Sequence, residues 1–162
     1  MEYENKILNL FKNGYLTTKD VNDNNIPRFY LTKLIKENKI ERVSRGVYIE
    51  KNELIDEFVI LQSKSKYAIY SNMTALYLHD LSNRIPIKYD ITVKSGYKGS
   101  LQTKDNVNLF YTKKELLNLG VINYKLDSGN VIRVYDLDKT ICDIIKNKKK
   151  LDSELFNKAI RE

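Results

Sequence analysis

The side chains best suited to chemistry in this sequence are the basic ones between residues 28 and 45. Six lysines and arginines stand there against two glutamates, a local net charge of +4. Such a density of cations suits nucleic-acid phosphates, because neutralising phosphates releases their counterions. The basic residues are Arg28, Lys33, Lys36, Lys39, Arg42 and Arg45.

The first half of this segment, residues 26–38, predicts a helix. Pro27 suits its first turn, and Asn24 or Asn25 could cap it. The apolar positions recur at helical spacing and predict one buried stripe, formed by Leu31, Leu34 and Ile35. The opposite side, with its flanks, would then face DNA.

The helix fits the major groove. Arg28 could donate to guanine O6 and N7, and Phe29 could lie against a thymine methyl group. An outward phenylalanine is unfavourable in water, which is why we assign it a contact. The predicted DNA-binding residues of the helix are Arg28, Phe29, Tyr30, Thr32, Lys33 and Lys36.

The second half of the segment predicts a β-hairpin. Residues 40–43 and 47–49 are rich in β-formers, and Ser44, Arg45 and Gly46 would make the turn, with Gly46 free to take a positive φ. Arg45, nearest the tip, is placed for a groove. Arg42 is placed for a phosphate, and Ser44 can add a neutral phosphate hydrogen bond.

Two shorter helices precede this pair of elements. Residues 3–13 are amphipathic, and Thr17 with Asp20 resembles a capping box at the start of a second helix. Three helices followed by a basic hairpin is the order of a winged helix-turn-helix. We therefore predict such a domain over residues 1–50. The alternative is an ordinary hairpin beside a solvated helix face.

A second domain is predicted over residues 53–162. Residues 53–63 form an amphipathic helix with Leu54, Phe58 and Leu61 facing inward, and Ser71 caps a helix that reaches Leu81. A helix is also expected over residues 113–119, and an apolar one over 137–145. Strands are expected over residues 87–93, 107–111, 121–126 and 131–135. The fold class is therefore α+β, a winged helix followed by a small mixed α/β domain.

The second domain offers few groups for catalysis. His79 ends a helix, where a packed or capping role is commoner, and Cys142 lies in an apolar helix, which predicts a buried thiol. Asp136, Asp138 and Asp143 could suggest magnesium-dependent nuclease chemistry, but helix capping explains the first two. No catalytic residue, metal ligand or cofactor site is predicted.

Charge and hydropathy bound the remaining possibilities. Residues 1–50 carry a net charge of +2 and residues 51–162 carry +5, so the total of +7 is spread along the chain. The run Lys146 to Lys150 is either a solvated loop or a second nucleic-acid contact. No apolar run approaches the ~20 residues of a membrane span, so a cytoplasmic location without a membrane partner is expected.

The ordered set of motifs resembles the AbiEi antitoxins. Gly14-Tyr15-Leu16-Thr17-Thr18, then Ile26 to Leu31, then the hairpin Ile40 to Tyr48 are similar to that family's N-terminal winged helix. Residues 68–82, with Ile91-Thr92-Val93 and Asp138 to Asp143, are similar to its second domain, although Lys139 stands where an arginine is more usual.

The resemblance implies a type IV toxin–antitoxin antitoxin linked to abortive phage infection. Such a protein represses its own operon by binding double-stranded operator DNA, expected here to contain inverted repeats. It also counters a nucleotidyltransferase-like toxin, and it is not an enzyme. The chain ends inside a predicted helix where family members generally continue, so a C-terminal truncation is expected.

Two other classes of function stay open at this point. One is a nucleic-acid-processing enzyme with catalytic carboxylates in residues 53–162. The other is a protein-docking module that uses its winged helix as a surface for a partner.

Overall fold

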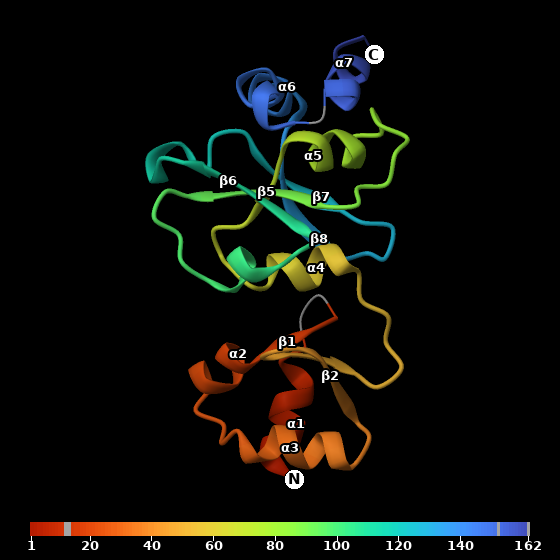
Figure 1. The fold of residues 1–162 in the computed structure, drawn as a ribbon. Coiled ribbons are helices and arrows are strands. Elements are labelled where there is room, and N and C mark those ends of the chain that lie inside the picture. The colour runs from red at the N-terminus through yellow and green to blue at the C-terminus, as the bar shows by residue number, and fades with distance from the viewer. Residues whose placement is uncertain (12–13, 152, 162) are drawn as a thin grey trace. The chain divides into compact units, whose positions relative to one another are not determined.

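The computed structural model describes residues 1–11, 14–151 and 153–161. The chain forms two compact units, drawn in Figure 1. Residues 1–63 with 125–131 make the first unit, and residues 64–124 with 132–162 make the second. Helices and sheets occur in both, so the α+β class is confirmed.

The first unit opens with the three predicted helices, α1 (Glu2–Asn9), α2 (Thr18–Asp23) and α3 (Phe29–Lys36). The predicted capping box of α2 is confirmed, because Thr17 N donates to Asp20 Oδ2 at 2.8 Å and Asp20 N donates to Thr17 Oγ1 at 3.2 Å. Helix α1 ends at Asn9, earlier than the expected residue 13; residues 12 and 13 lie outside the described residues.

The start of α3 differs from the prediction. Its N-cap is Arg28, without a side-chain capping bond, so neither Asn24 nor Asn25 caps it. Asn25 instead takes φ +55° in the turn that follows α2. Asparagine tolerates this left-handed conformation better than most residues. The turn therefore uses asparagine to reverse the chain between α2 and α3.

A three-stranded antiparallel sheet completes the winged helix. Its strands β1 (Leu16–Thr17), β2 (Ile40–Ser44) and β3 (Val47–Glu50) are ordered β1-β3-β2. The hairpin turn is Arg45-Gly46, with Gly46 at φ +73°. Ser44 belongs to β2, where it pairs with Val47, rather than to the turn. The pairing shifts between Arg42 and Ser44, which leaves Val43 as a bulge.

The core of this unit joins the helices to one face of the sheet. Helices α1 and α3 lie on the same side of the sheet in Figure 1. The buried stripe of α3 contains Leu31 and Leu34, but Ile35 is 36% exposed, so its predicted burial is wrong. The core cluster consists of Ile7, Leu16, Val21, Ile26, Leu31, Leu34 and Ile40.

A short helix, α4 (Glu57–Gln62), follows at the end of the first unit's main segment. The predicted helix began at residue 53 with Leu54 inward, but residues 53–56 are not helical and Leu54 is 95% exposed. Asp56 is the N-cap, and Val59 and Leu61 are the buried apolar side chains of α4. The helix is therefore too short to carry Leu54 on its apolar face.

The second unit is built on a mixed five-stranded sheet with the strand order β6-β5-β4-β8-β7. Strands β5 and β6 run parallel, as do β4 and β8, whereas β4 and β5 are antiparallel. The strands are β4 (Ile69–Tyr70), β5 (Tyr89–Lys94), β6 (Val107–Thr112), β7 (Val121–Lys125) and β8 (Val131–Tyr135).

Three helices lie on one side of this sheet in Figure 1. They are α5 (Asn72–Leu78), α6 (Leu137–Lys146) and α7 (Ser153–Arg161). Short 3-10 helices occur at η1 (Ser100–Thr103), η2 (Lys114–Leu116) and η3 (Lys148–Lys150). The α-helix expected over residues 113–119 is only the 3-10 helix η2.

Helix α6 departs from its predicted burial. Asp136 caps it as expected, accepting from Lys139 N at 2.8 Å. Cys142 is exposed, so the prediction of a buried thiol is wrong. Of the apolar side chains, Ile144 is buried, whereas Leu137, Ile141 and Ile145 are exposed. Periodicity identified the apolar residues of this helix but not which of them a neighbour covers.

A buried polar cluster fixes the start of α5 on β5. Asp90, 4% exposed, accepts at Oδ2 from Met73 N at 3.0 Å and at Oδ1 from Asn108 Nδ2 at 3.1 Å. Asp90 N donates to Thr74 Oγ1 at 2.8 Å. Burial raises the pKa of Asp90 from 3.8 to about 6, although both side-chain hydrogen bonds act in the opposite direction.

The raised pKa of Asp90 predicts a pH-dependent stability. In the folded state Asp90 keeps its proton up to about pH 6, whereas in the unfolded state it loses the proton near pH 3.8. The free energy of unfolding therefore falls as pH rises between these values. At about 1.4 kcal/mol per pKa unit, the full cost above pH 6 is on the order of 3 kcal/mol. The other charged groups lining the same cavity are Arg84, Lys88 and Lys150.

Urea unfolding of the wild type and of Asp90→Asn from pH 4 to pH 7.5 measures this cost. The variant should gain stability relative to the wild type as pH rises, because the amide cannot ionise. Parallel stability curves for the two proteins would contradict the assignment.

Candidate nucleic-acid interface

The exposed side of α3 carries four of the predicted contact residues. Arg28, Phe29, Thr32 and Lys36 are all exposed, and Phe29 is 69% exposed. Ile35 adds a second partly exposed apolar side chain beside them. A helix that contacts DNA needs cations for the phosphates and apolar groups for the thymine methyl groups, and this face carries both.

Arg28 is oriented by the end of the preceding helix. Its Nε donates to Asn22 Oδ1 of α2 at 3.0 Å. A guanine contact uses two donors of the guanidinium, and this bond occupies only the Nε donor. The bond therefore holds the side chain in place without using its Nη donors.

Tyr30 lies on a different flank from the exposed face. It is half-buried, with its ring 5.2 Å from Tyr3 of α1 and 5.7 Å from Phe29, measured between centroids. The Phe29 contact is edge-on. Tyr30 thus packs α3 against α1 and contacts the ring of Phe29, so its role is to position Phe29.

Lys33 is engaged within the protein. Its Nζ donates to Glu4 Oε1 of α1 and lies 3.8 Å from Glu37 Oε1. Lys39 lies 3.7 Å from Glu4 and 2.8 Å from Glu37. The hydrogen bond that Lys33 donates to Glu4 lowers the pKa of Glu4 and raises the pKa of Lys33. Two of the six basic residues therefore have their charge balanced within the unit.

Glu4 helps to position these lysines, although it was not among the residues predicted from the sequence. Glu4 is 7% exposed, on the side of α1 that also carries the fully buried Ile7. The signal was present, because residues three apart share a helix face and a charge beside a core position needs a partner. The partners, however, are distant in sequence and could not be named from it.

The hairpin presents Arg42 and Arg45 as exposed side chains and Ser44 as a half-buried one. Arg42 Nε donates to Ser44 O at 3.2 Å, beside the bulge. Thr18 N donates to Gly46 O at 2.9 Å, which ties the hairpin tip to the start of α2. A Cβ at Gly46 would approach Thr18 Oγ1 to 3.2 Å as well as straining the positive φ. The wing is therefore short and anchored.

The residues weighed for catalysis in the second unit have structural contacts. His79 Nε2 forms a hydrogen bond with Tyr135 O at 2.8 Å, and its ring meets Tyr124 edge-on. This is the packed helix-end position that was predicted. Asp143 pairs with Lys139. Over residues 1–11, 14–151 and 153–161, no group of three or more His, Cys, Asp or Glu is placed to hold a metal ion.

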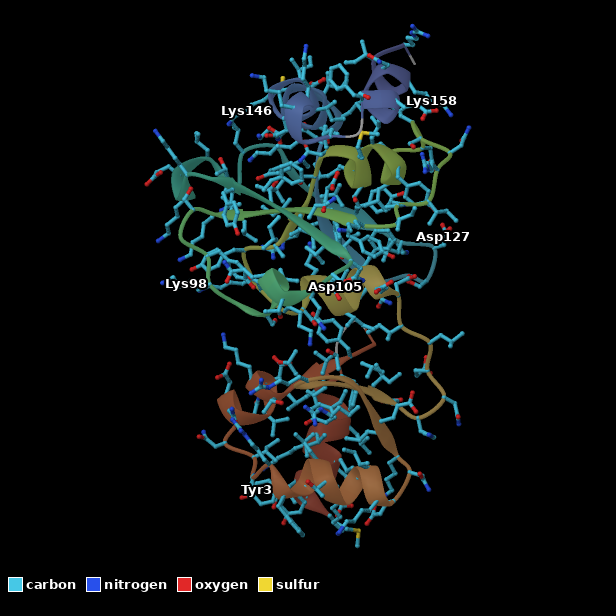
Figure 2. All side chains as sticks on the ribbon, in the orientation of Figure 1. Tyr3, Lys98, Asp105, Asp127, Lys146 and Lys158 are labelled. Atoms are coloured by element: carbon cyan, nitrogen blue, oxygen red, sulfur yellow. The ribbon has the colours of Figure 1, made fainter. Side chains whose placement is uncertain are left out.

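The lysines of the run Lys146 to Lys150 are all exposed. Lys146 and Lys158 mark this end of the second unit in Figure 2. No helix in the described part of the chain is long and apolar enough to cross a membrane.

Comparison with known proteins finds a family model that is similar to the winged helix. Residues 5–51 match the family model described as transcriptional regulator, AbiEi antitoxin. The match runs from α1 to the residue after β3, so the resemblance stated from the sequence is confirmed for this segment. It supports a DNA-binding antitoxin role and a winged-helix type of N-terminal domain. No curated protein matches the chain.

The contrast between Lys33 and Lys36 gives a prediction with a built-in control. Lys33→Ala should lower the melting temperature, because it leaves the buried Glu4 with less compensation, while costing little in DNA affinity. Lys36→Ala, the same change one turn away on the exposed face, should leave the melting temperature unchanged. It should reduce the steepness of log affinity against log salt by about 0.9, one phosphate contact. Thermal unfolding and fluorescence anisotropy on duplex DNA measure both effects; the reverse pattern would place Lys33 on the phosphates.

Proposed function

We propose that this chain is a DNA-binding antitoxin that represses its own operon through the winged helix. The observation that carries the proposal is the exposed face of α3, where Phe29 stands outward among Arg28, Thr32 and Lys36. A solvent-exposed phenylalanine beside two cations is accounted for by a thymine methyl group in the major groove. The match of residues 5–51 to antitoxin transcriptional regulators supports the same function.

The proposed roles divide between base reading and backbone contact. Arg28, Phe29 and Thr32 read base edges in the major groove, and Lys36 binds a phosphate. On the wing, Arg42 and Ser44 contact the sugar-phosphate backbone, and Arg45 enters the minor groove, which attracts arginine most where it is narrow and A·T-rich. Lys33 and Tyr30 act as positioning residues, because their contacts lie within the protein.

Substitutions on α3 test the base-reading role. Arg28→Ala and Phe29→Ala should each weaken binding to the DNA upstream of the protein's own gene by roughly 1–3 kcal/mol. Both substitutions should weaken binding to a random DNA duplex much less. Lys98→Ala is a matched control for charge, because Lys98 is an exposed lysine of the second unit (Figure 2). Anisotropy titrations of both duplexes at two salt concentrations measure the effect. If both variants bind both duplexes as the wild type does, this helix is not the reader.

We further propose that antitoxicity belongs to residues 53–162 and acts on a nucleotidyltransferase-like toxin, as the family resemblance implies. The R28A/F29A double variant of the full chain should then lose operator repression and keep neutralisation of the toxin encoded beside it. A reporter fusion and a growth assay with the co-expressed toxin measure the two activities. Loss of neutralisation in a variant that is folded by circular dichroism would count against two separable functions.

A further inference from the structure

A cavity of about 330 Å³ lies in the second unit, beside the start of α5. Such a volume is at the small end of the range for ligand pockets. The segment 82–88 contributes most of its lining residues, and α5, β5, β6 and the residues around η3 contribute the rest. Its lining residues are Met73, Ser82, Arg84, Ile85, Pro86, Ile87, Lys88, Asp90, Asn108, Lys150 and Leu151.

The buried end of the cavity is Asp90. Its two carboxylate oxygens each accept one hydrogen bond, from Met73 N and from Asn108 Nδ2, and it is 4% exposed. Each oxygen of a carboxylate can accept a second bond. No ion pair to Asp90 is formed among the described residues. A ligand with two adjacent N–H donors would therefore satisfy a buried acceptor pair that the protein satisfies only in part.

The sides and rim of the cavity differ in character from Asp90. Ile85 and Ile87 flank Pro86 and are 70% and 78% exposed, an apolar surface left in water. Arg84, Lys88 and Lys150 are exposed cations that line the same cavity. The cavity therefore has hydrogen-bond acceptors at its buried end, apolar walls and cations at its exposed rim. These features match, in the same order, the base edge, the ring faces and the phosphate of a nucleotide.

We propose that this cavity binds a guanosine 5′-phosphate group, either as a free nucleotide or at the 5′ end of a strand. Guanine is the base that offers two adjacent donors on one edge, N1–H and the N2 amino group, to the two oxygens of a carboxylate. The apolar walls cover the faces of the ring, and Arg84, Lys88 and Lys150 at the rim neutralise the phosphate. This site is separate from the winged helix and does not depend on operator binding.

Isothermal titration of the full chain tests the proposal, with GMP, AMP, UMP and inorganic phosphate as probes. GMP should bind saturably, and AMP and UMP about tenfold or more weakly, the discrimination of one bidentate base contact. A 5′-phosphorylated guanine-led trinucleotide distinguishes the two sources. Binding of that strand without GMP binding assigns the site to strand ends, and binding of both assigns it to the nucleotide itself.

Variants separate the parts of the site. Lys88→Ala should weaken GMP several-fold and leave guanosine unchanged, while Lys98→Ala, the matched control outside the cavity, should leave both unchanged. Asp90→Asn should remove the preference for guanine. Because Asp90 also has a structural role, the circular dichroism of this variant is measured beside the titration. Lys88→Ala tests the site independently of that result. Absence of saturable binding by both GMP and the trinucleotide, or equal affinity for GMP, AMP and phosphate, overturns the proposal. Operator binding is measured on the same samples, so its loss and the loss of nucleotide binding are told apart.

Discussion

The buried carboxylate of Glu4 is the constraint on which the proposed DNA-binding surface depends. A charge removed from water needs partners, and those of Glu4 are Lys33 on α3 and Lys39 just before β2. Glu37, in the turn between them, contacts both lysines. The network thus joins α1 to the C-terminal half of α3 and to the start of the hairpin. Its geometry fixes the rotation of α3, and that rotation decides which side chains face outward.

The same rotation explains why some side chains of α3 form contacts within the protein while others are exposed. Leu31 and Leu34 point into the core, and Lys33 and Tyr30 face α1, so the remaining arc belongs to Arg28, Phe29, Thr32 and Lys36. Ile35 closes that arc at its edge. A helical wheel gives the angular order of these residues. It does not say how wide the buried sector is, because that width depends on how many neighbours pack against the helix.

Local signals in the sequence were enough to predict the winged helix. The Thr17–Asp20 box, the glycine at the hairpin tip and the order of three helices and a hairpin are each short-range, and each is present. Burial was less predictable. Leu54 was expected inside on periodicity and Cys142 because its helix is apolar, yet both are exposed. An apolar residue is buried only if another element covers it, and that information lies elsewhere in the chain.

The candidate site likewise combines features that local sequence predicts with features that depend on distant residues. The exposure of Phe29 could be predicted from helical spacing alone, whereas the ion pair of Lys33 with Glu4 joins residues 29 positions apart. The cavity around Asp90 brings together β5, β6, the start of α5 and η3, and nothing in the local sequence indicates that these segments meet. Asp90 lies in a strand in which the three residues that follow it, from Ile91 to Val93, are buried as well. A carboxylate in a fully buried strand has no solvent side, so it requires partners.

Charge balance within residues 1–50 limits how the winged helix can use electrostatics. Their net charge is only +2, and the Glu4 network holds two of the basic side chains of the 28–45 segment. Four basic residues of that segment remain on exposed side chains, namely Arg28, Lys36, Arg42 and Arg45. With so few phosphate contacts per chain, the proposed complex would gain only modest non-specific attraction to DNA, since each contact contributes only about 0.9 to the salt dependence. Under this proposal, selective binding would rest mainly on base contacts, and Phe29 and Arg28 are the exposed side chains of α3 proposed to make them.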